Sequence, residues 1–172
     1  MDVTTKNVVN NNYDIDLFFP INANENDCNF FEHFYNDYQS HHLLALYGDR
    51  NYLKDKISIS KNDLSNILIK NPYTLEVYGF IGLYEIDSKD QGFLHIYLKK
   101  EFRNKKIGIN AIRLFFIFLN SLKFHYCKRI ILKFKRCNFI MNKICKKLKF
   151  KLYYRTYSED LEPLVAYMQE LQ

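Results

Sequence analysis

The sequence predicts a mixed α/β domain whose sheet has about seven strands. The chain of 172 residues has the length of one domain, and a composition of 48% hydrophobic and 26% charged residues excludes collagenous and largely disordered proteins. Short segments with an apolar residue at every second position predict strands, and longer segments with a 3.6-residue apolar period predict helices. Strands and helices alternate along the chain, which is the pattern of an α/β sheet.

The chain begins with a polar N-terminal segment, called the lead below. Residues 1–12 are rich in Asn, and we expect them to be flexible ahead of a single domain of residues 13–172. Residues 29–46 predict helix, in one or two pieces, and residues 51–57 predict a further helical turn. Residues 13–20 predict the first strand, because alternation places three apolar side chains on one face: Ile15, Leu17 and Phe19.

Three strands and a helix follow in the middle of the chain. Residues 66–70 and 75–86 are strand-like and are separated by the turn signal Asn71-Pro72. Residues 92–98 predict another strand, and the pattern becomes helical from Lys106. This helix is apolar on most sides, which indicates burial against a sheet, and its main stripe is Ile107, Ala111, Leu114, Phe118 and Leu122.

The last part of the chain returns to strands. Residues 129–135 predict a strand, and Asn138 is a suitable N-cap for a helix whose apolar positions include Cys145. Residues 150–157 and 164–171 predict a closing pair of strands joined by a polar connection.

Charge is distributed unevenly along the chain. The formal net charge is +6, but residues 99–155 hold 18 Lys and Arg and one acidic residue, whereas the other residues hold 7 basic and 18 acidic ones. This split favours an anionic partner near the basic part, either a phosphate-rich cofactor or a nucleic acid. The alternative is that many of these lysines only solvate helix and strand surfaces.

The expected location is the cytoplasm. No segment is long enough to span a bilayer, and the N-terminus lacks the apolar core of a signal peptide. The four cysteines form no Cys-x-x-Cys pair, which argues for reduced thiols. No set of His and Cys residues has the compact spacing of a zinc site, so we expect no metal.

The most informative segment is the basic connection between the strand at 92–98 and the helix that begins near Lys106. The first N–H groups of a helix lack partners within the helix, and the helix dipole adds positive charge there, so such a turn suits a pyrophosphate. Gly108, the last glycine of the chain, either permits close approach of a ligand or only eases the packing of helix on sheet.

This connection resembles the signature of the GCN5-related N-acetyltransferases (GNAT), which is Arg or Gln, two residues, Gly, one residue, then Gly or Ala. Here it reads Arg103-Asn104-Lys105-Lys106-Ile107-Gly108, with Lys106 in place of the middle Gly. Lys106 keeps its backbone N–H, so we expect the change to affect loop geometry more than the number of donors.

Two further segments are similar to the same family. The stretch from Asn138 to Phe150 resembles the family's helix Asn-x-x-Ala…Tyr-x-x-Leu-Gly-Phe, with Asn138, Leu148 and Phe150 in place. Residues 77–83, Val-Tyr-Gly-Phe-Ile-Gly-Leu, resemble a strand of the family that contains a Gly-Phe pair. The resemblance covers most of the chain, but its specific motifs begin only at residue 77.

The resemblance implies a GNAT-like fold: a mixed, mostly antiparallel seven-stranded sheet flanked by about four helices, with the strand at 92–98 splayed from the strand at 129–135. It implies acetyl-CoA or another acyl-CoA as co-substrate and transfer of the acyl group to a primary amine. Lys99 and Lys100 would add positive charge around the phosphates of the acyl-CoA. The implied cofactor-binding residues are Ile96, Tyr97, Leu98, Arg103, Asn104, Lys105, Lys106, Ile107, Gly108, Ile109 and Asn138.

Two residues are candidates for catalysis. Cys145 stands where the family has a Tyr that protonates the leaving thiolate, although its apolar neighbours favour a buried structural cysteine, and Tyr153 or Tyr154 could take that role instead. His95 could act as the general base, because an unperturbed imidazole has a pKa of about 6.5. It could also face a solvated side of the sheet.

The acceptor is the least defined part of the hypothesis. Residues 34–37, Phe-Tyr-Asn-Asp, resemble a segment of relatives that act on ribosomal-protein N-termini, amino sugars and other small amines. We therefore expect a small-molecule or peptide amine as partner, and a monomer or homodimer. The alternatives are a non-catalytic GNAT-like module that binds RNA or protein, or an acetyltransferase that acts on charged tRNA, since the basic segment suits nucleic acid.

Overall fold

The seven expected strands form one sheet. The computed structural model describes five stretches of the chain, which are residues 15–18, 67–86, 90–121, 127–158 and 161–171. Within them the strands lie in the order β1-β2-β3-β4-β5-β7-β6. The predicted lead at 1–12 and the predicted helices at 29–46 and 51–57 lie outside the described residues.

From β2 onward, the boundaries of the elements are close to those expected. The strands are β1 (Asp16–Phe18), β2 (Ile67–Lys70), β3 (Val77–Ile86), β4 (Gln91–Leu98), β5 (Arg129–Lys135), β6 (Lys151–Tyr157) and β7 (Pro163–Glu170). The described helices are α4 (Ile107–Ser121), α5 (Phe139–Lys147) and the 3-10 turn η2 (Lys100–Phe102). All neighbouring strands are antiparallel except β4 and β5, which confirms the mixed, mostly antiparallel sheet.

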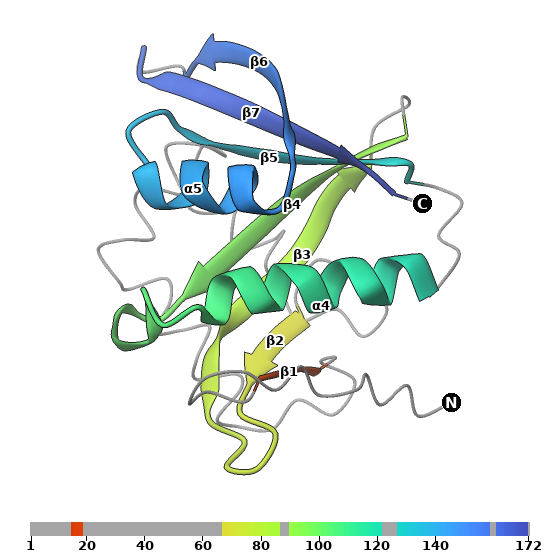
Figure 1. The fold of residues 1–172 in the computed structure, drawn as a ribbon, viewed down its shortest axis with the longest axis vertical. Helices are drawn as coiled ribbons and strands as arrows, with labels where there is room; N and C mark the ends of the chain where they lie inside the picture. The colour runs from red at the N-terminus through yellow and green to blue at the C-terminus, as the bar shows by residue number, and fades with distance from the viewer. Residues whose placement is uncertain (1–14, 19–66, 87–89, 122–126, 159–160, 172) are drawn as a thin grey trace.

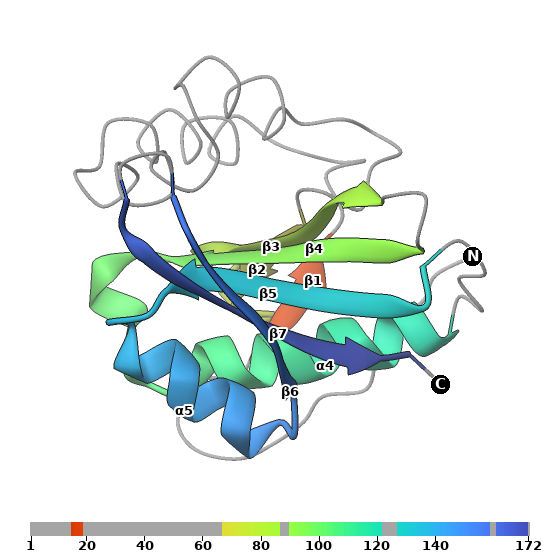
Figure 2. The same ribbon diagram turned by 90° about the horizontal axis from the view of Figure 1, so that it is seen from above.

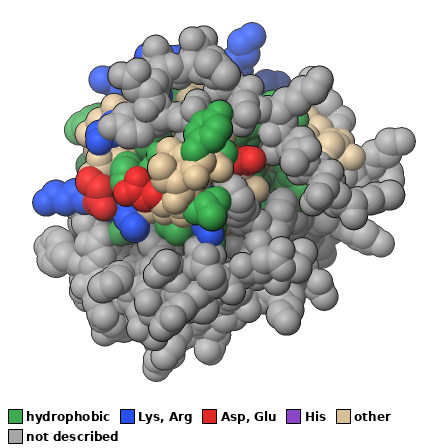
Figure 3. Space-filling view, turned by 90° about the horizontal axis from the view of Figure 1, so that it is seen from below, with side chains coloured by type: hydrophobic (Ala, Val, Ile, Leu, Met, Phe, Trp, Pro, Cys, Tyr) green, Lys and Arg blue, Asp and Glu red, His purple; other side chains and the backbone are tan. Residues whose placement is uncertain are grey.

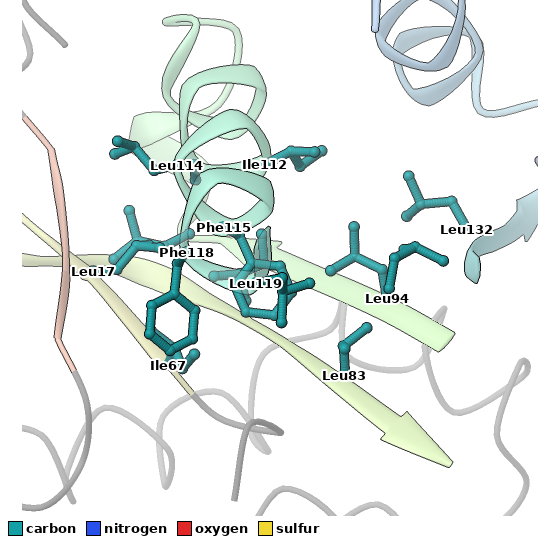
Figure 4. Close-up of a cluster of buried hydrophobic side chains, with 14 of the residues drawn as sticks. Leu17, Ile67, Leu83, Leu94, Ile112, Leu114, Phe115, Phe118, Leu119 and Leu132 are labelled. Atoms are coloured by element: carbon teal, nitrogen blue, oxygen red, sulfur yellow. The ribbon is translucent and has the colours of Figure 1, made fainter. Parts of the chain in front are cut away.

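Helices α4 and α5 cover the same face of the sheet (Figures 1 and 2). The apolar stripe of α4 is buried there, as predicted, from Ile107 to Phe118. Figure 4 shows Ile112 of α4 on the side of the helix that faces Leu94 of β4 and Leu132 of β5, in the cluster of buried hydrophobic side chains. None of the helices in the described part of the chain is long and apolar enough to cross a membrane.

Local side-chain hydrogen bonds explain where two elements begin. The side chain of Asn71 accepts hydrogen bonds from the N–H groups of Tyr73 (2.8 Å) and Thr74 (3.0 Å), which forms the predicted turn between β2 and β3. Leu75 follows in the left-handed region (φ 60°), so β3 begins at Val77, two residues later than the sequence predicts. The described side chains at the end of the molecule that carries this turn include hydrophobic, acidic and basic ones (Figure 3).

Helix α5 begins and ends as its sequence indicates. The side chain of Asn138 accepts a hydrogen bond from the N–H of Met141 (3.0 Å), which confirms the predicted N-cap. At the other end, Lys149 takes the left-handed conformation (φ 63°), and the N–H of Phe150 bonds to the carbonyl oxygen of Cys145 (2.9 Å).

Candidate active site

The central feature of the sheet is an opening between β4 and β5. The two strands pair at Gln91–Arg129, Gly92–Ile130 and Phe93–Ile131, and their ladder ends there. Beyond this point β4 remains paired with β3, and β5 remains paired with β7. The expected splay between the two strands is therefore confirmed.

The backbone of β4 directs alternate residues into this opening. The N–H of Lys99 donates to the carbonyl oxygen of Tyr78 on β3 (2.9 Å). Because successive residues of a strand point their N–H and C=O groups in opposite directions, Ile96 and Leu98 turn theirs toward the opening. The carbonyl oxygen of Leu98 accepts a 2.8 Å hydrogen bond from Nε of Arg103. The backbone N–H and C=O groups of Ile96 thus lie along the open edge of β4.

The loop from η2 to α4 has an unusual backbone. Asn104 and Lys106 both have φ of 62°, in the left-handed region that favours glycine. Lys106 stands where the GNAT signature has its middle Gly, so this lysine adopts a conformation that a glycine would adopt without strain. Left-handed residues in a turn of this kind bring successive N–H groups together into a concave anion-binding surface.

The first turn of α4 supplies three backbone N–H groups as hydrogen-bond donors. The N–H of Asn110 bonds back to the carbonyl oxygen of Lys106 (3.2 Å) and so begins the helical hydrogen-bond pattern. In the part of the chain that the structure describes, no backbone carbonyl accepts from the N–H groups of Ile107, Gly108 or Ile109. These donors, together with the helix dipole, form a site suited to a phosphate oxygen.

A cleft of about 630 Å³ joins the opening, the loop and helix α5. This volume is typical of small-molecule and cofactor sites. Among the described residues that line it, six are Lys or Arg and none is acidic, so the cleft is suited to a multiply charged anion. The basic residues are Arg103, Lys106, Lys133, Lys135, Lys143 and Lys147.

Most of the predicted cofactor-binding residues line this cleft. Nine of them do so: Ile96, Tyr97, Leu98, Arg103, Asn104, Lys106, Gly108, Ile109 and Asn138. The side chain of Ile107 is instead buried in the core, and Lys105 lies over the ring of Phe102 at 5.6 Å from its centroid. Lys99 and Lys100 also lie outside the lining.

Four cleft lysines were not predicted by the sequence analysis. Lys133 and Lys135 lie on β5, and Lys143 and Lys147 lie one turn apart on α5. The signal that could have found them is their spacing, because residues two apart on a strand or four apart on a helix share a face.

His95 and Tyr97 lie on the face of β4 opposite α4. Both rings contact Phe80 of β3, with centroid distances of 5.4 Å for His95 and 5.7 Å for Tyr97. The guanidinium of Arg103 lies over the ring of Tyr97 at 5.4 Å. His95 is 7% exposed and lines the cleft, whereas its neighbour Leu94 packs into the core on the other face.

Cys145 lies in the core and outside the described lining of the cleft. Its side chain is completely buried, and burial raises the pKa of its thiol to about 12. Tyr153 and Tyr154 also lie outside the cleft lining. Tyr153 accepts a 3.4 Å hydrogen bond from the side chain of Gln91, and burial raises the pKa of Tyr154 above its usual value.

Comparison with known proteins identifies the fold. No family model matches the sequence, and no curated protein matches it. Solved structures do match at low sequence identity. One is a spermidine N-acetyltransferase from Vibrio cholerae in complex with CoA and spermine, with a TM-score of 0.71 and 12% identity over 91% of this chain and 95% of that chain.

Two other similar structures are protein N-terminal acetyltransferases. One is the ribosomal L7/L12 alpha-N-protein acetyltransferase RimL in complex with coenzyme A, with a TM-score of 0.68 and 12% identity over 96% of this chain and 98% of that chain. The other, from Salmonella typhimurium, modifies the N-terminal serine of ribosomal protein L7/L12, with a TM-score of 0.67 and 13% identity over 92% and 95% of the two chains. The chain therefore has the fold of the GCN5-related N-acetyltransferases.

Proposed function

We propose that this protein is an N-acetyltransferase that transfers an acetyl or other acyl group from acyl-CoA to a primary amine. The observation that carries the proposal is the opening between β4 and β5, which leads directly to the donors at the start of α4. Two structures with the same fold are complexes with CoA, which supports this proposal.

The cleft offers suitable groups to the pantetheine arm and to the pyrophosphate of CoA. The backbone of Ile96 can bond the amides of the pantetheine arm as a neighbouring strand would. The N–H groups of Ile107, Gly108 and Ile109 can bind the pyrophosphate, with the ammonium of Lys106 beside them. Lys143 and Lys147 on α5 add positive charge to the wall of the cleft.

The reaction requires two proton movements. The acceptor ammonium must lose a proton before its nitrogen attacks the thioester carbonyl carbon; a C–N bond then forms, the C–S bond breaks, and the leaving thiolate takes up a proton. We assign the first role to His95, which lines the cleft from β4. We assign Cys145 a packing role, because a thiol with a pKa of about 12 is a poor proton donor to a thiolate.

The proposal is tested first by binding and then by turnover. Acetyl-CoA should raise the melting temperature of the protein in a concentration-dependent way, because it binds only the folded state. A panel of amines with acetyl-CoA should then release free CoA thiol, which is measured with a chromogenic disulfide. The absence of any acetyl-CoA stabilisation would overturn the proposal.

A second candidate is a binding module for nucleic acid. It is favoured by the exposed basic residues from α5 to β6, among them Lys146, Lys149 and Arg155. RNA affinity should fall steeply with salt, whereas stabilisation by acetyl-CoA should depend on salt much less. Tight RNA binding without acetyl-CoA stabilisation would favour this second function.

A further inference from the structure

We propose that the preferred acceptor is an anionic amine, a primary amine with a carboxylate or phosphate close to it, and that Lys133 recognises this acidic group. The inference rests on the proposed function and specifies the substrate class of the same site. It follows from the position of Lys133, from the face of the sheet on which it lies, and from the absence of a counter-ion within the described part of the chain.

Lys133 lies beside the point where β4 and β5 separate. The last paired residue of β5 is Ile131, two positions earlier, and Lys133 lines the cleft. Extension of the β4–β5 register places Lys133 level with His95, the residue assigned to deprotonate the acceptor. Lys133 is therefore next to the place where the amine meets the thioester in the proposed reaction.

Lys133 also lies on the acceptor side of the sheet. Its neighbours Leu132 and Phe134 are buried in the core beneath α4 and α5, so alternation along β5 directs Lys133 to the opposite face. His95 shares that face, because Leu94 beside it packs into the same core. An acceptor must approach from this face, since the two helices cover the other one (Figure 2).

The charge of Lys133 is not neutralised by any residue that the structure describes. Lys135, the next residue of β5 on this face, forms an ion pair with Glu162 at 3.3 Å. No ion pair of this kind involves Lys133 within the described stretches of the chain. Within the described stretches, the ammonium of Lys133 thus has no paired carboxylate, and its side chain is partly shielded from solvent.

A free cation at this position selects acceptors by charge. It repels a second cation, so a polyamine is disfavoured, and it attracts an acceptor whose acidic group reaches it. It also favours the neutral form of a nearby amine, which is the form that attacks the thioester. The carboxylate or phosphate holds the acceptor in place while its amine faces His95.

The test uses pairs of acceptors that differ only in the acidic group. The pairs are β-alanine with its amide, phosphoethanolamine with ethanolamine, and two short peptides that begin Gly-Asp and Gly-Asn; spermidine serves as the polycation. We expect kcat/KM to favour the acidic member of at least one pair by about tenfold or more. If the preference is confined to the peptides or to the small molecules, it shows which of these two classes supplies the acidic acceptor.

Variants at position 133 then link the preference to this side chain. Lys133→Met should remove the preference, Lys133→Arg should retain it, and Lys133→Glu should reverse it toward the neutral or cationic amine. Lys128→Met is the matched control, because Lys128 is exposed, pairs with Asp90 and lies outside the cleft lining.

Each result decides the matter. The proposal is overturned if the wild-type enzyme shows no preference, or if Lys133→Met loses activity equally with both members of a pair. It is also overturned if none of the amines is acetylated while acetyl-CoA still stabilises the protein. The last of these leaves the cofactor part of the proposed function intact. A lack of acetyl-CoA stabilisation overturns the proposed function itself.

Discussion

Nε of Arg103 donates a 2.8 Å hydrogen bond to the carbonyl oxygen of Leu98, and so ties the loop before α4 to the last residue of β4. The same guanidinium lies over the ring of Tyr97. One side chain thus fixes the open edge of β4 relative to the N–H groups of α4. In the proposed function these two parts hold the pantetheine arm and the pyrophosphate of one ligand.

Replacement of Arg103 should therefore weaken both the fold and the cofactor site. Arg103→Ala should lower the free energy of unfolding by about 1–2 kcal/mol, because a charged hydrogen bond and a cation–π contact are lost. Affinity for acetyl-CoA, measured by calorimetry, should fall about tenfold. Arg113→Ala is the control, since Arg113 is exposed on α4 outside the cleft lining, and an equal effect there would contradict this role.

Glycine variants of Lys106 and Lys149 measure how much their left-handed backbone conformation lowers the free energy of unfolding. Both have φ near 62°, so Lys106→Gly and Lys149→Gly should each raise the free energy of unfolding by up to about 1 kcal/mol. Only Lys106 lines the cleft, so only Lys106→Gly should weaken acetyl-CoA binding at low salt. Urea denaturation and a binding titration measure the two effects. Equal affinities of the two variants would show that the Lys106 ammonium does not contact the phosphates.

Gly108 should tolerate a methyl group but not a carboxylate. A Cβ at Gly108 would lie 3.4 Å from Cδ1 of Leu98, which is a tight but adjustable contact. Gly108→Ala should therefore fold and still bind acetyl-CoA, whereas Gly108→Glu should fold and lose binding, because it places an anion against the pyrophosphate. Ile117→Glu on the exposed side of α4 is the control. Undiminished affinity in a folded Gly108→Glu protein would refute the assigned phosphate site.

Cys145 should contribute to stability and not to turnover. Cys145→Ala should lower the free energy of unfolding by about 1–2 kcal/mol, because a small buried side chain is truncated. The kcat per folded molecule should remain unchanged. A loss of kcat of about 100-fold or more in a folded Cys145→Ala protein would instead make the thiol a catalytic acid.

The raised pKa of Cys145 also predicts a dependence of stability on pH. Below pH 9 the thiol is protonated in both the folded and unfolded states, so it contributes no slope. Between about pH 9 and pH 12 the unfolded state loses this proton and the folded state keeps it, so stability falls as the pH rises. The fall should be about 1 kcal/mol per pH unit and absent in Cys145→Ala, as measured by urea denaturation at pH 8, 9 and 10.

His95 should affect turnover more than binding. His95→Gln should lower kcat by about 100-fold or more while the Kd of acetyl-CoA changes little, because only proton removal from the acceptor is impaired. The rate of His95→Gln should also recover partly at high pH, where more of the amine is already neutral. An unchanged kcat would assign His95 a structural role against Phe80.

The sequence by itself determined the local features of this protein. The Asn71 turn, the Asn138 cap and the buried stripe of α4 depend on residues within a few positions of one another, so periodicity and turn chemistry predict them. The same local patterns predicted strands β2 to β7 to within about two residues of their observed ends. The basic connection before α4 was also visible, because its charge and its glycine are adjacent in the chain.

The tertiary structure alone decided which side chains meet at the cleft. Whether Lys133 faces the cleft depends on how β5 lies against β4, and that pairing joins residues 38 positions apart, such as Gln91 and Arg129. The burial of Cys145 depends in the same way on the docking of α5 against the core. The left-handed conformation of Lys106 opposes the local preference of a lysine, so the sequence pattern does not predict it. Contacts between distant segments set the orientation of Lys133 and the burial of Cys145, and a local sequence pattern does not contain that information.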